Sequence, residues 1–311
     1  MVTGAVLVAA VAAVLAPQRV LFVDTARGLV LRSVELPGVG LAIFAAPDGR
    51  AMVPLQGEDV TAVVAPTGKV ERWPGRVFPL FFADYDRMHV VLPGMLATLS
   101  YPERLMLEQV PIEGLPGARR AACSDDGRLV AVIPAVPGAR ALLLVAAVEG
   151  GTVRQVDLAG DATHVVVAPS GAFAVVASGD TLTAAVLGEP RTRAGLSVGG
   201  EVRSLCLLPN GRDVIAGLAT GAAGEVVAVR VDPRAQQPLK ERFRTPLGAP
   251  AVAVATPDED VAAISGDVLV VLIRGGRRIG RQVVVPGARD LAVLPARARS
   301  TVPAWSDAQK P

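Results

Sequence analysis

Aromatic residues, cysteines and histidines are all scarce in this sequence, and each scarcity excludes a class of protein. Cys123 and Cys206 are the only cysteines among 311 residues, too few for the disulfide framework that stabilises small secreted domains. We expect both to be buried thiols, because each lies in an apolar stretch typical of a strand. His89 and His164 are the only histidines and are too far apart for a short zinc motif. The sequence therefore predicts no metal and no other cofactor.

An excess of charge of one sign is also missing. The formal net charge is +2, and the 31 lysines and arginines are scattered along the chain rather than gathered in one segment. Proteins that bind nucleic acid usually carry a basic patch or stripe, so we expect no nucleic acid as a partner. We also expect no transmembrane segment, because the N-terminal apolar run Ala5–Ala16 has twelve residues and a membrane-spanning helix needs about 20.

The run Ala5–Ala16 has two interpretations, which the sequence leaves open. Residues 1–16 fit a signal peptide in the length of their apolar core, although no Lys or Arg precedes it and Pro17 would follow the cleavage site. Alternatively, Gly4–Ala10 is a buried strand, because it resembles the apolar segment Gly127–Val132 later in the chain. The first interpretation predicts export to the periplasm or out of the cell, and the second leaves the cytoplasm as the expected compartment.

What the sequence does contain is valine, alanine and leucine in short runs, with frequent turns between them. Hydrophobic residues make up 51% of the chain, and there are 32 glycines and 25 prolines. β-Branched valine favours strands over helices, and so many glycines and prolines interrupt any long helix. These features predict an all-β protein with short strands and a sizeable core.

One turn followed by a strand recurs along nearly the whole chain. Its clearest copy is Ser124–Arg128, with the sequence Ser-Asp-Asp-Gly-Arg, followed by the apolar run Leu129–Ile133. In such a turn Asp, Asn or Ser bonds its own backbone and Gly supplies a positive φ, so each copy is a hairpin connection. Equivalent turn positions recur at intervals of 38 to 48 residues: Asp48, Asp86, Asp126, Ser170, Asn210, Asp258 and Ala296. This spacing indicates an array of seven repeats.

Each repeat has room for four short strands. After the turn Ser124–Arg128 and its strand, for example, come the candidate strands Ala141–Val145 and Thr152–Val156. Four strands in about forty residues are typical of one blade of a β-propeller. The chain opens with second, third and fourth strands and ends with an unpartnered first strand, Asp290–Leu294. We therefore predict a seven-bladed β-propeller of four-stranded antiparallel blades over residues 1–296, with the last blade closed by both termini, and a C-terminal tail, residues 297–311.

The segment Arg19–Gly38, which begins Arg-Val-Leu-Phe-Val-Asp-Thr, resembles the YVTN-repeat propellers of the YncE-like type. It looks like that family's third and fourth strands around an aspartate-threonine turn, and turns such as Pro47–Gly49 supply the junction of first and second strands. The resemblance covers residues 4–296. It implies a β-propeller fold and says little about activity.

No catalytic motif accompanies the repeats. A Gly-x-Ser-x-Gly nucleophile elbow and a P-loop are both absent. Trp73 and Trp305 are the only tryptophans, so the tryptophan docking motifs of quinoprotein propellers are absent too. Most carboxylates lie in the turns, where hydrogen bonds to the backbone account for them. These absences favour a protein without enzymatic activity.

Charged residues recur at one level of the predicted inner strands, which line the central channel of a propeller. Counting back seven or eight residues from each turn glycine, or its equivalent, finds arginines in blades three, five and seven and further polar residues beside them: Arg119, Arg120, His164, Arg203, Arg289 and Asp290. Guanidinium groups in a confined channel bind carboxylates or phosphates, so these six residues are the predicted ligand-binding site. The alternative is that the arginines are solvated in the preceding loops, or pair with Asp290 and Glu201.

Two functions fit this sequence. The first is a monomeric, non-enzymatic binding or scaffold protein that holds a partner protein or a small anionic ligand at one end of the channel. The second is a lactonase-like hydrolase acting on a sugar lactone or a similar small molecule, because propellers of the resembling kind include sugar-lactone hydrolases. Arg120, His164 and Asp290 are the residues that would carry such a reaction.

Overall fold

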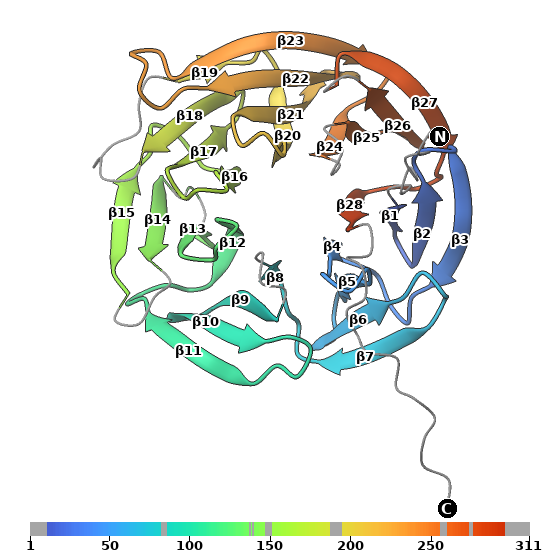
Figure 1. The fold of residues 1–311 in the computed structure, drawn as a ribbon, viewed down its shortest axis with the longest axis horizontal. Coiled ribbons are helices and arrows are strands. Elements are labelled where there is room, and N and C mark those ends of the chain that lie inside the picture. The colour runs from blue at the N-terminus through green and yellow to red at the C-terminus, as the bar shows by residue number, and fades with distance from the viewer. Residues whose placement is uncertain are drawn as a thin grey trace, which may run out of the picture.

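A computed structural model describes residues 11–81, 86–136, 138, 140–146, 151–186, 195–255, 260–273 and 276–295. In these residues, 28 strands form seven four-stranded antiparallel sheets. The sheets stand around a common axis as the blades of a propeller (Figure 1), so the predicted all-β, seven-bladed fold is confirmed. The described part of the chain has no helix, and therefore none with the length and hydropathy to cross a membrane.

The first strand of each blade lies nearest the axis and the fourth lies at the periphery (Figure 1). Blades 1 to 4 consist of β4 (Phe44–Ala45), β5 (Ala51–Pro54), β6 (Val60–Val64) and β7 (Val70–Pro74); β8 (Pro79–Phe81), β9 (Arg87–Leu92), β10 (Met95–Ser100) and β11 (Met106–Pro111); β12 (Ala118–Cys123), β13 (Leu129–Pro134), β14 (Ala141–Ala146) and β15 (Val153–Asp157); and β16 (His164–Val167), β17 (Phe173–Ser178), β18 (Thr181–Val186) and β19 (Leu196–Ser197). Blades 5 to 7 consist of β20 (Glu201–Leu207), β21 (Asp213–Thr220), β22 (Ala223–Val231) and β23 (Leu239–Leu247); β24 (Ala251–Ala255), β25 (Val261–Ser265), β26 (Val268–Ile273) and β27 (Arg278–Val284); and β28 (Asp290–Leu294), β1 (Val11–Ala16), β2 (Arg19–Asp24) and β3 (Leu29–Glu35).

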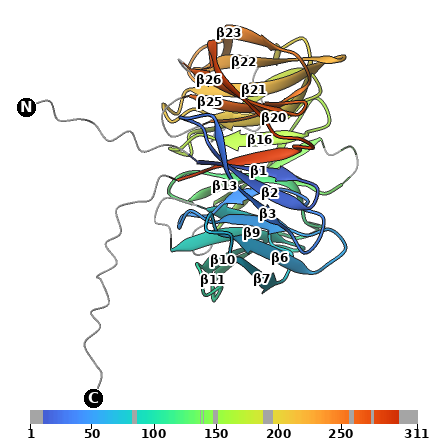
Figure 2. The ribbon, with the colours of Figure 1, turned by 90° about the vertical axis from the view of Figure 1, so that its right-hand side faces the viewer.

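Blade 7 closes the ring with strands from both ends of the chain. β28 pairs antiparallel with β1, and Leu291 faces Val14 in this register. The blue strands β1 to β3 accordingly stand beside the red β28 in Figure 1, and Figure 2 shows β28 next to β1 from the side. The predicted closure is confirmed, and the N-terminal strand that pairs with β28 is Val11–Ala16. The predicted strand Gly4–Ala10 and the tail 297–311 lie outside the described residues.

The turns between first and second strands have the predicted chemistry. Four turn glycines adopt φ between +64° and +81°, in the left-handed region that favours glycine: Gly49, Gly127, Gly171 and Gly211. In one of these turns the N–H of Gly127 donates to the carbonyl oxygen of Ser124 over 3.0 Å. Asp126 Oδ1 accepts from the backbone N–H of Arg128, also at 3.0 Å. The repeat positions Asp258 and Ala296 lie outside the described residues.

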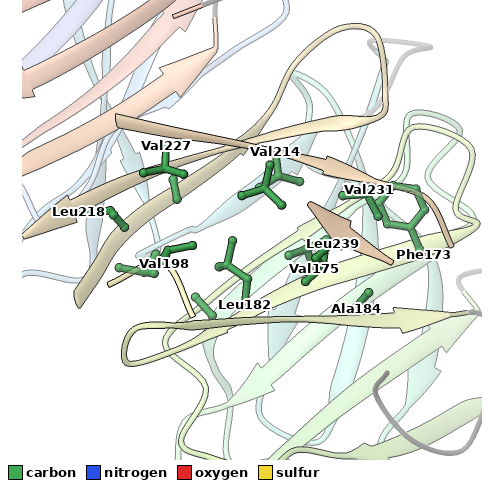
Figure 3. Packing of buried hydrophobic residues seen from close by; sticks show 14 of the residues in the cluster. Phe173, Val175, Leu182, Ala184, Val198, Val214, Leu218, Val227, Val231 and Leu239 are labelled. Carbon is green, nitrogen blue, oxygen red and sulfur yellow. The ribbon is translucent and has the colours of Figure 1, made fainter. Parts of the chain in front are cut away.

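The core lies between neighbouring blades. Figure 3 shows the contact between blades 4 and 5, where Val175 and Leu182 of blade 4 pack near Val214 and Val227 of blade 5. All four side chains are fully buried, and burying a side chain of this kind contributes about 1.5–3 kcal/mol. An isolated sheet would leave these apolar faces in water, so the blades stack. The stacking fixes the inner strands around the channel.

One histidine and both cysteines have structural positions. His89 is buried in β9 of blade 2, and its Nε2 lies 2.7 Å from the carbonyl oxygen of Gly127 in blade 3. A carbonyl can only accept, so Nε2 donates, and Nδ1 lies 3.0 Å from Thr98 Oγ1. His89 therefore joins two blades. Cys123 and Cys206 are free thiols in β12 and β20. The prediction was that both are buried, and in the structure each is partly buried.

Candidate functional site

The inner strands all run through the channel in the same direction, because each begins a blade and ends at the turn to the second strand. We call the face where the inner strands begin the start face, and the opposite one the turn face. The six predicted site residues lie at the beginning of β12, β16, β20 and β28 or directly before these strands. They therefore occupy the start face.

The backbone is irregular at this level. Arg119 is the extra, unpaired residue of a β-bulge in β12, and Arg203 is the extra residue of a bulge in β20. A bulge bends its strand and redirects side chains, and bulges are frequent next to functional sites. The repeat pattern in the sequence placed both arginines at one level but did not predict that both would leave the regular pairing.

Blades 4 and 7 show a similar irregularity. Ala177 faces His164 in the register. The carbonyl oxygen of Ala177, however, accepts a hydrogen bond from the backbone N–H of Thr163 over 2.8 Å. Leu15 faces Asp290, but its carbonyl oxygen accepts the N–H of Arg289 at 2.8 Å. In blades 3, 4, 5 and 7, two successive residues of the inner strand thus oppose a single residue of the second strand.

His164 lies among three of the predicted arginines. Burial is the largest cause that lowers its pKa, to about 4, and the positive charges of Arg120, Arg119 and Arg203 lower it further. A hydrogen bond with the backbone of Arg203 opposes this shift. The imidazole is therefore neutral at pH 7. Because charges act strongly only at short range, the shift places guanidinium groups of blades 3 and 5 near the histidine of blade 4.

The four arginines differ in how their charge is balanced. Arg203 pairs with Glu201 at 2.7 Å, and both side chains are about half exposed. This is one of the pairs that the alternative interpretation predicted. Arg119 and Arg120 are exposed and make no hydrogen bond or ion pair with other described side chains. Arg289 is exposed as well and lies directly before β28, next to Asp290, where its backbone N–H donates to the carbonyl oxygen of Leu15.

Asp290 joins the closing blade to blade 1. Its two carboxylate oxygens accept hydrogen bonds from the backbone N–H groups of Ile43, at 3.1 Å, and Leu291, at 2.9 Å. Burial raises the pKa of this carboxyl group, and the two N–H groups and the charge of Arg120 oppose the rise. Asp290 forms no ion pair with a described arginine, so this half of the alternative interpretation is not what the structure has. Its contacts are those of a structural residue.

A pocket of about 190 Å³ adjoins Arg119 and Arg120. It is lined from blades 1, 2 and 3 by Phe44, Phe78, Leu80, Val91, Ala118, Arg119, Arg120 and Ala121. The rings of Phe44 and Phe78 meet edge to face, with centroids 6.1 Å apart and planes at 90°, an arrangement that aromatic pairs prefer. Phe78 is nevertheless 43% exposed. One wall of this mouth pocket is therefore aromatic and another is cationic.

The repeat pattern pointed to the arginines of the cationic wall but not to the phenylalanines of the aromatic one. Phe44 lies five residues before the turn glycine Gly49, and Phe78 lies directly before β8, so neither is at the level that was compared among the repeats. A large aromatic residue on a channel-lining strand, in a chain with few aromatics, is the signal that could have found Phe44.

A larger cavity, of about 630 Å³, lies on the turn face between blades 4 and 5. Arg212, Arg230 and Arg234 contribute to its lining. Arg230 donates two hydrogen bonds to Asp213, one of them over 2.9 Å, so its charge is balanced within the protein. Nowhere in the described ranges do three His, Cys, Asp or Glu side chains gather in a way that could hold a metal ion.

No protein-family model matches this chain, and no curated protein matches its sequence. Solved structures do match its fold. A protein of unknown function from Desulfotomaculum acetoxidans is 13% identical, with a TM-score of 0.71 over 91% of this chain and 98% of that one. A proposed 6-phosphogluconolactonase from Bacteroides uniformis is 12% identical, with a TM-score of 0.68 over 92% and 99%. Apo AztD from Citrobacter koseri is 10% identical, with a TM-score of 0.60 over 93% and 99%. At these identities the likeness shows a shared β-propeller fold.

Proposed function

We propose that this protein is a non-enzymatic β-propeller that binds a small anionic ligand at the start face of its channel. The observation that carries the proposal is the pair Arg119 and Arg120, which form no hydrogen bond or ion pair with the described side chains and lie beside a preformed pocket. Two neighbouring guanidinium groups can each donate two parallel hydrogen bonds to a carboxylate or phosphate. The predicted membership of the YVTN-repeat propellers is part of this proposal and rests on the sequence resemblance.

The surroundings of the two arginines favour an anion over other ligands. The positive charges of both arginines, which belong to blade 3, lower the pKa of His164 in blade 4, so their field reaches the neighbouring blade. Low-dielectric walls strengthen this field, and Phe44 and Leu80 supply such walls. An anion in the mouth would therefore gain more from these charges than one at an open arginine on the surface.

A lactonase-like hydrolase is the second candidate, and the fold of the proposed 6-phosphogluconolactonase is what favours it. A hydrolase working at neutral pH needs a general base with a pKa near 7. His164 has a pKa of about 4, so its imidazole is a weak base. Both oxygens of Asp290 already accept backbone hydrogen bonds. For these reasons we favour binding without catalysis.

Thermal denaturation in the presence of simple anions tests the proposed function. A ligand that binds only the folded chain stabilises it by about 2.7 kcal/mol at a hundred times its Kd. We expect phosphate, acetate or a larger carboxylate to raise the Tm of the wild-type protein, and the Arg119→Ala/Arg120→Ala variant to lose that rise. Arg128→Ala is the matched control, because Arg128 is exposed on the turn face, and it should respond as the wild type does. Equal Tm shifts in all three proteins would overturn the proposal.

A further inference from the structure

We infer that the ligand of the mouth pocket is a small amphipathic carboxylate, with its acidic group on Arg119 and Arg120 and a phenyl-sized apolar group against Phe44 and Phe78. This inference rests on the proposed function and makes it specific. It comes from the composition of the pocket lining, in which two arginines are accompanied by two phenylalanines, a leucine, a valine and two alanines. No acidic side chain is among the residues that line it.

The size of the pocket limits the apolar part of the ligand. Its volume is about 190 Å³, and an engineered apolar cavity of about 150 Å³ in another protein holds one benzene molecule. The pocket therefore has room for one six-membered ring or a short branched acyl chain, together with a one-carbon link to the carboxylate. A nucleotide or a disaccharide is too large to enter it completely.

The aromatic wall has a shape that suits a ring. Phe44 and Phe78 meet at 90°, so a third ring that enters the angle between them can contact the face of one phenyl group and the edge of the other. Such contacts stabilise a bound ring beyond the effect of the buried area alone. Phe78 is 43% exposed without a ligand, and a bound ring would cover part of that surface.

The cationic wall favours a carboxylate over a neutral polar group. Arg119 and Arg120 come from the same inner strand, and the bulge at Arg119 breaks the regular alternation of side chains there. Hydrogen bonds to charged groups are stronger than those to neutral ones. His164 is neutral at pH 7 and adds no charge that titrates near neutrality. Affinity for a carboxylate should therefore hardly change between pH 6 and 8.

Isothermal titration with three matched probes tests the inference. Phenylacetate carries both the ring and the carboxylate, phenylacetamide keeps the ring and lacks the charge, and acetate keeps the charge and lacks the ring. We expect phenylacetate to bind at least tenfold more tightly than either of the other two, since a factor of ten corresponds to about 1.4 kcal/mol and each half supplies at least that much. Inorganic phosphate serves as a second probe for the arginines alone.

Two variants separate the two walls. Phe78→Ala should weaken phenylacetate about fivefold or more by removing an aromatic contact, and should leave acetate and phosphate unchanged. Arg119→Ala/Arg120→Ala should abolish measurable binding of all the anions. Leu105→Ala is the matched control, because Leu105 is a large apolar side chain that is 64% exposed far from the channel, between β10 and β11, and it should bind as the wild type does.

The outcomes distinguish this inference from the function on which it rests. If acetate or phosphate binds as tightly as phenylacetate and the arginine variant loses both, the anion site stands and the amphipathic ligand is refuted. If phenylacetamide binds as tightly as phenylacetate, the charge is not used, and both the inference and the proposed function fail. If none of the probes binds the wild-type protein, both fail as well.

Discussion

The contact between blade 7 and blade 1, where the ring closes, can be tested with two substitutions that should partly compensate. Leu15 of β1 is 1% exposed, and Gly40 lies directly against it. A Cβ atom added at Gly40 would be 2.6 Å from Leu15 Cδ1 and 2.7 Å from Val53 Cγ1. Gly40 does not have a positive φ, so an alanine there would be strained by these two neighbours and not by its backbone.

The expected magnitudes follow from the packing. Leu15→Ala removes a fully buried side chain and should cost about 2–5 kcal/mol, including the cavity that remains. Gly40→Ala overpacks the same region and should cost about 1–3 kcal/mol. In the double variant the new methyl group occupies part of the space left by Leu15, although the contact with Val53 remains. We therefore expect the double variant to lose at least about 1 kcal/mol less than the sum of the two single losses.

Urea unfolding of the four proteins, followed by far-ultraviolet circular dichroism, measures these free energies. The control combines Gly40→Ala with Leu142→Ala, because Leu142 is equally buried but belongs to blade 3. Distant sites normally add within about 0.5 kcal/mol, so this second pair should be additive. Additivity of Leu15→Ala with Gly40→Ala would refute the packing of Val11–Ala16 at the closure of the ring.

Three further predictions concern single residues. Asp290→Ala leaves the N–H groups of Ile43 and Leu291 without their acceptor, which should cost about 1–3 kcal/mol for each buried group. Asp290→Asn keeps one acceptor oxygen and should cost less. Equal losses of the two variants in urea unfolding would contradict the role of Asp290 as an acceptor for these two groups. His164 has a pKa of about 4 in the folded protein, below its ordinary value of 6.5, so the unfolded chain binds this proton first as the pH falls. The free energy of unfolding should therefore decrease between pH 6.5 and 4, by at most about 3 kcal/mol. Above pH 6.5 the histidine should have no effect on it. A stability difference between wild type and His164→Gln that stays constant from pH 7 to 4 would exclude this coupling. Burial raises the pKa of the Cys123 thiol to about 12, so iodoacetamide should alkylate it far more slowly in the native protein than in urea; equal rates, followed by mass spectrometry, would show that the thiol is accessible and acidic.

The fold could be predicted because its signals are local. A turn such as Ser124–Arg128 specifies one hairpin through a glycine with positive φ and an aspartate that accepts a backbone N–H. Seven turn positions at similar spacing, four of them with such a glycine, fix the number of blades, and the leftover strand Asp290–Leu294 requires a partner from the N-terminus. The partner is Val11–Ala16, whose place in a uniformly apolar run gave no boundary to recognise.

The site was only half predictable, because it depends on contacts between repeats. Counting along the repeats put Arg119 and Arg203 at one level and His164 at the next level along the strand, and the positive charges of both arginines contribute to the lowered pKa of His164. The same counting also included Arg289, which lies on the start face directly before β28. Phe44 and Phe78 meet across two blades, and no spacing within one repeat encodes that meeting.

The most direct test of the anion site is a crystal structure of the protein with 4-bromophenylacetate. The anomalous signal of bromine locates the ligand without reference to any assumed position. We expect the bromine between Phe44 and Phe78 and the carboxylate on Arg119 and Arg120. A bromine peak confined to the turn-face cavity, or no peak at the start face when the ligand saturates the protein, would contradict the proposed site.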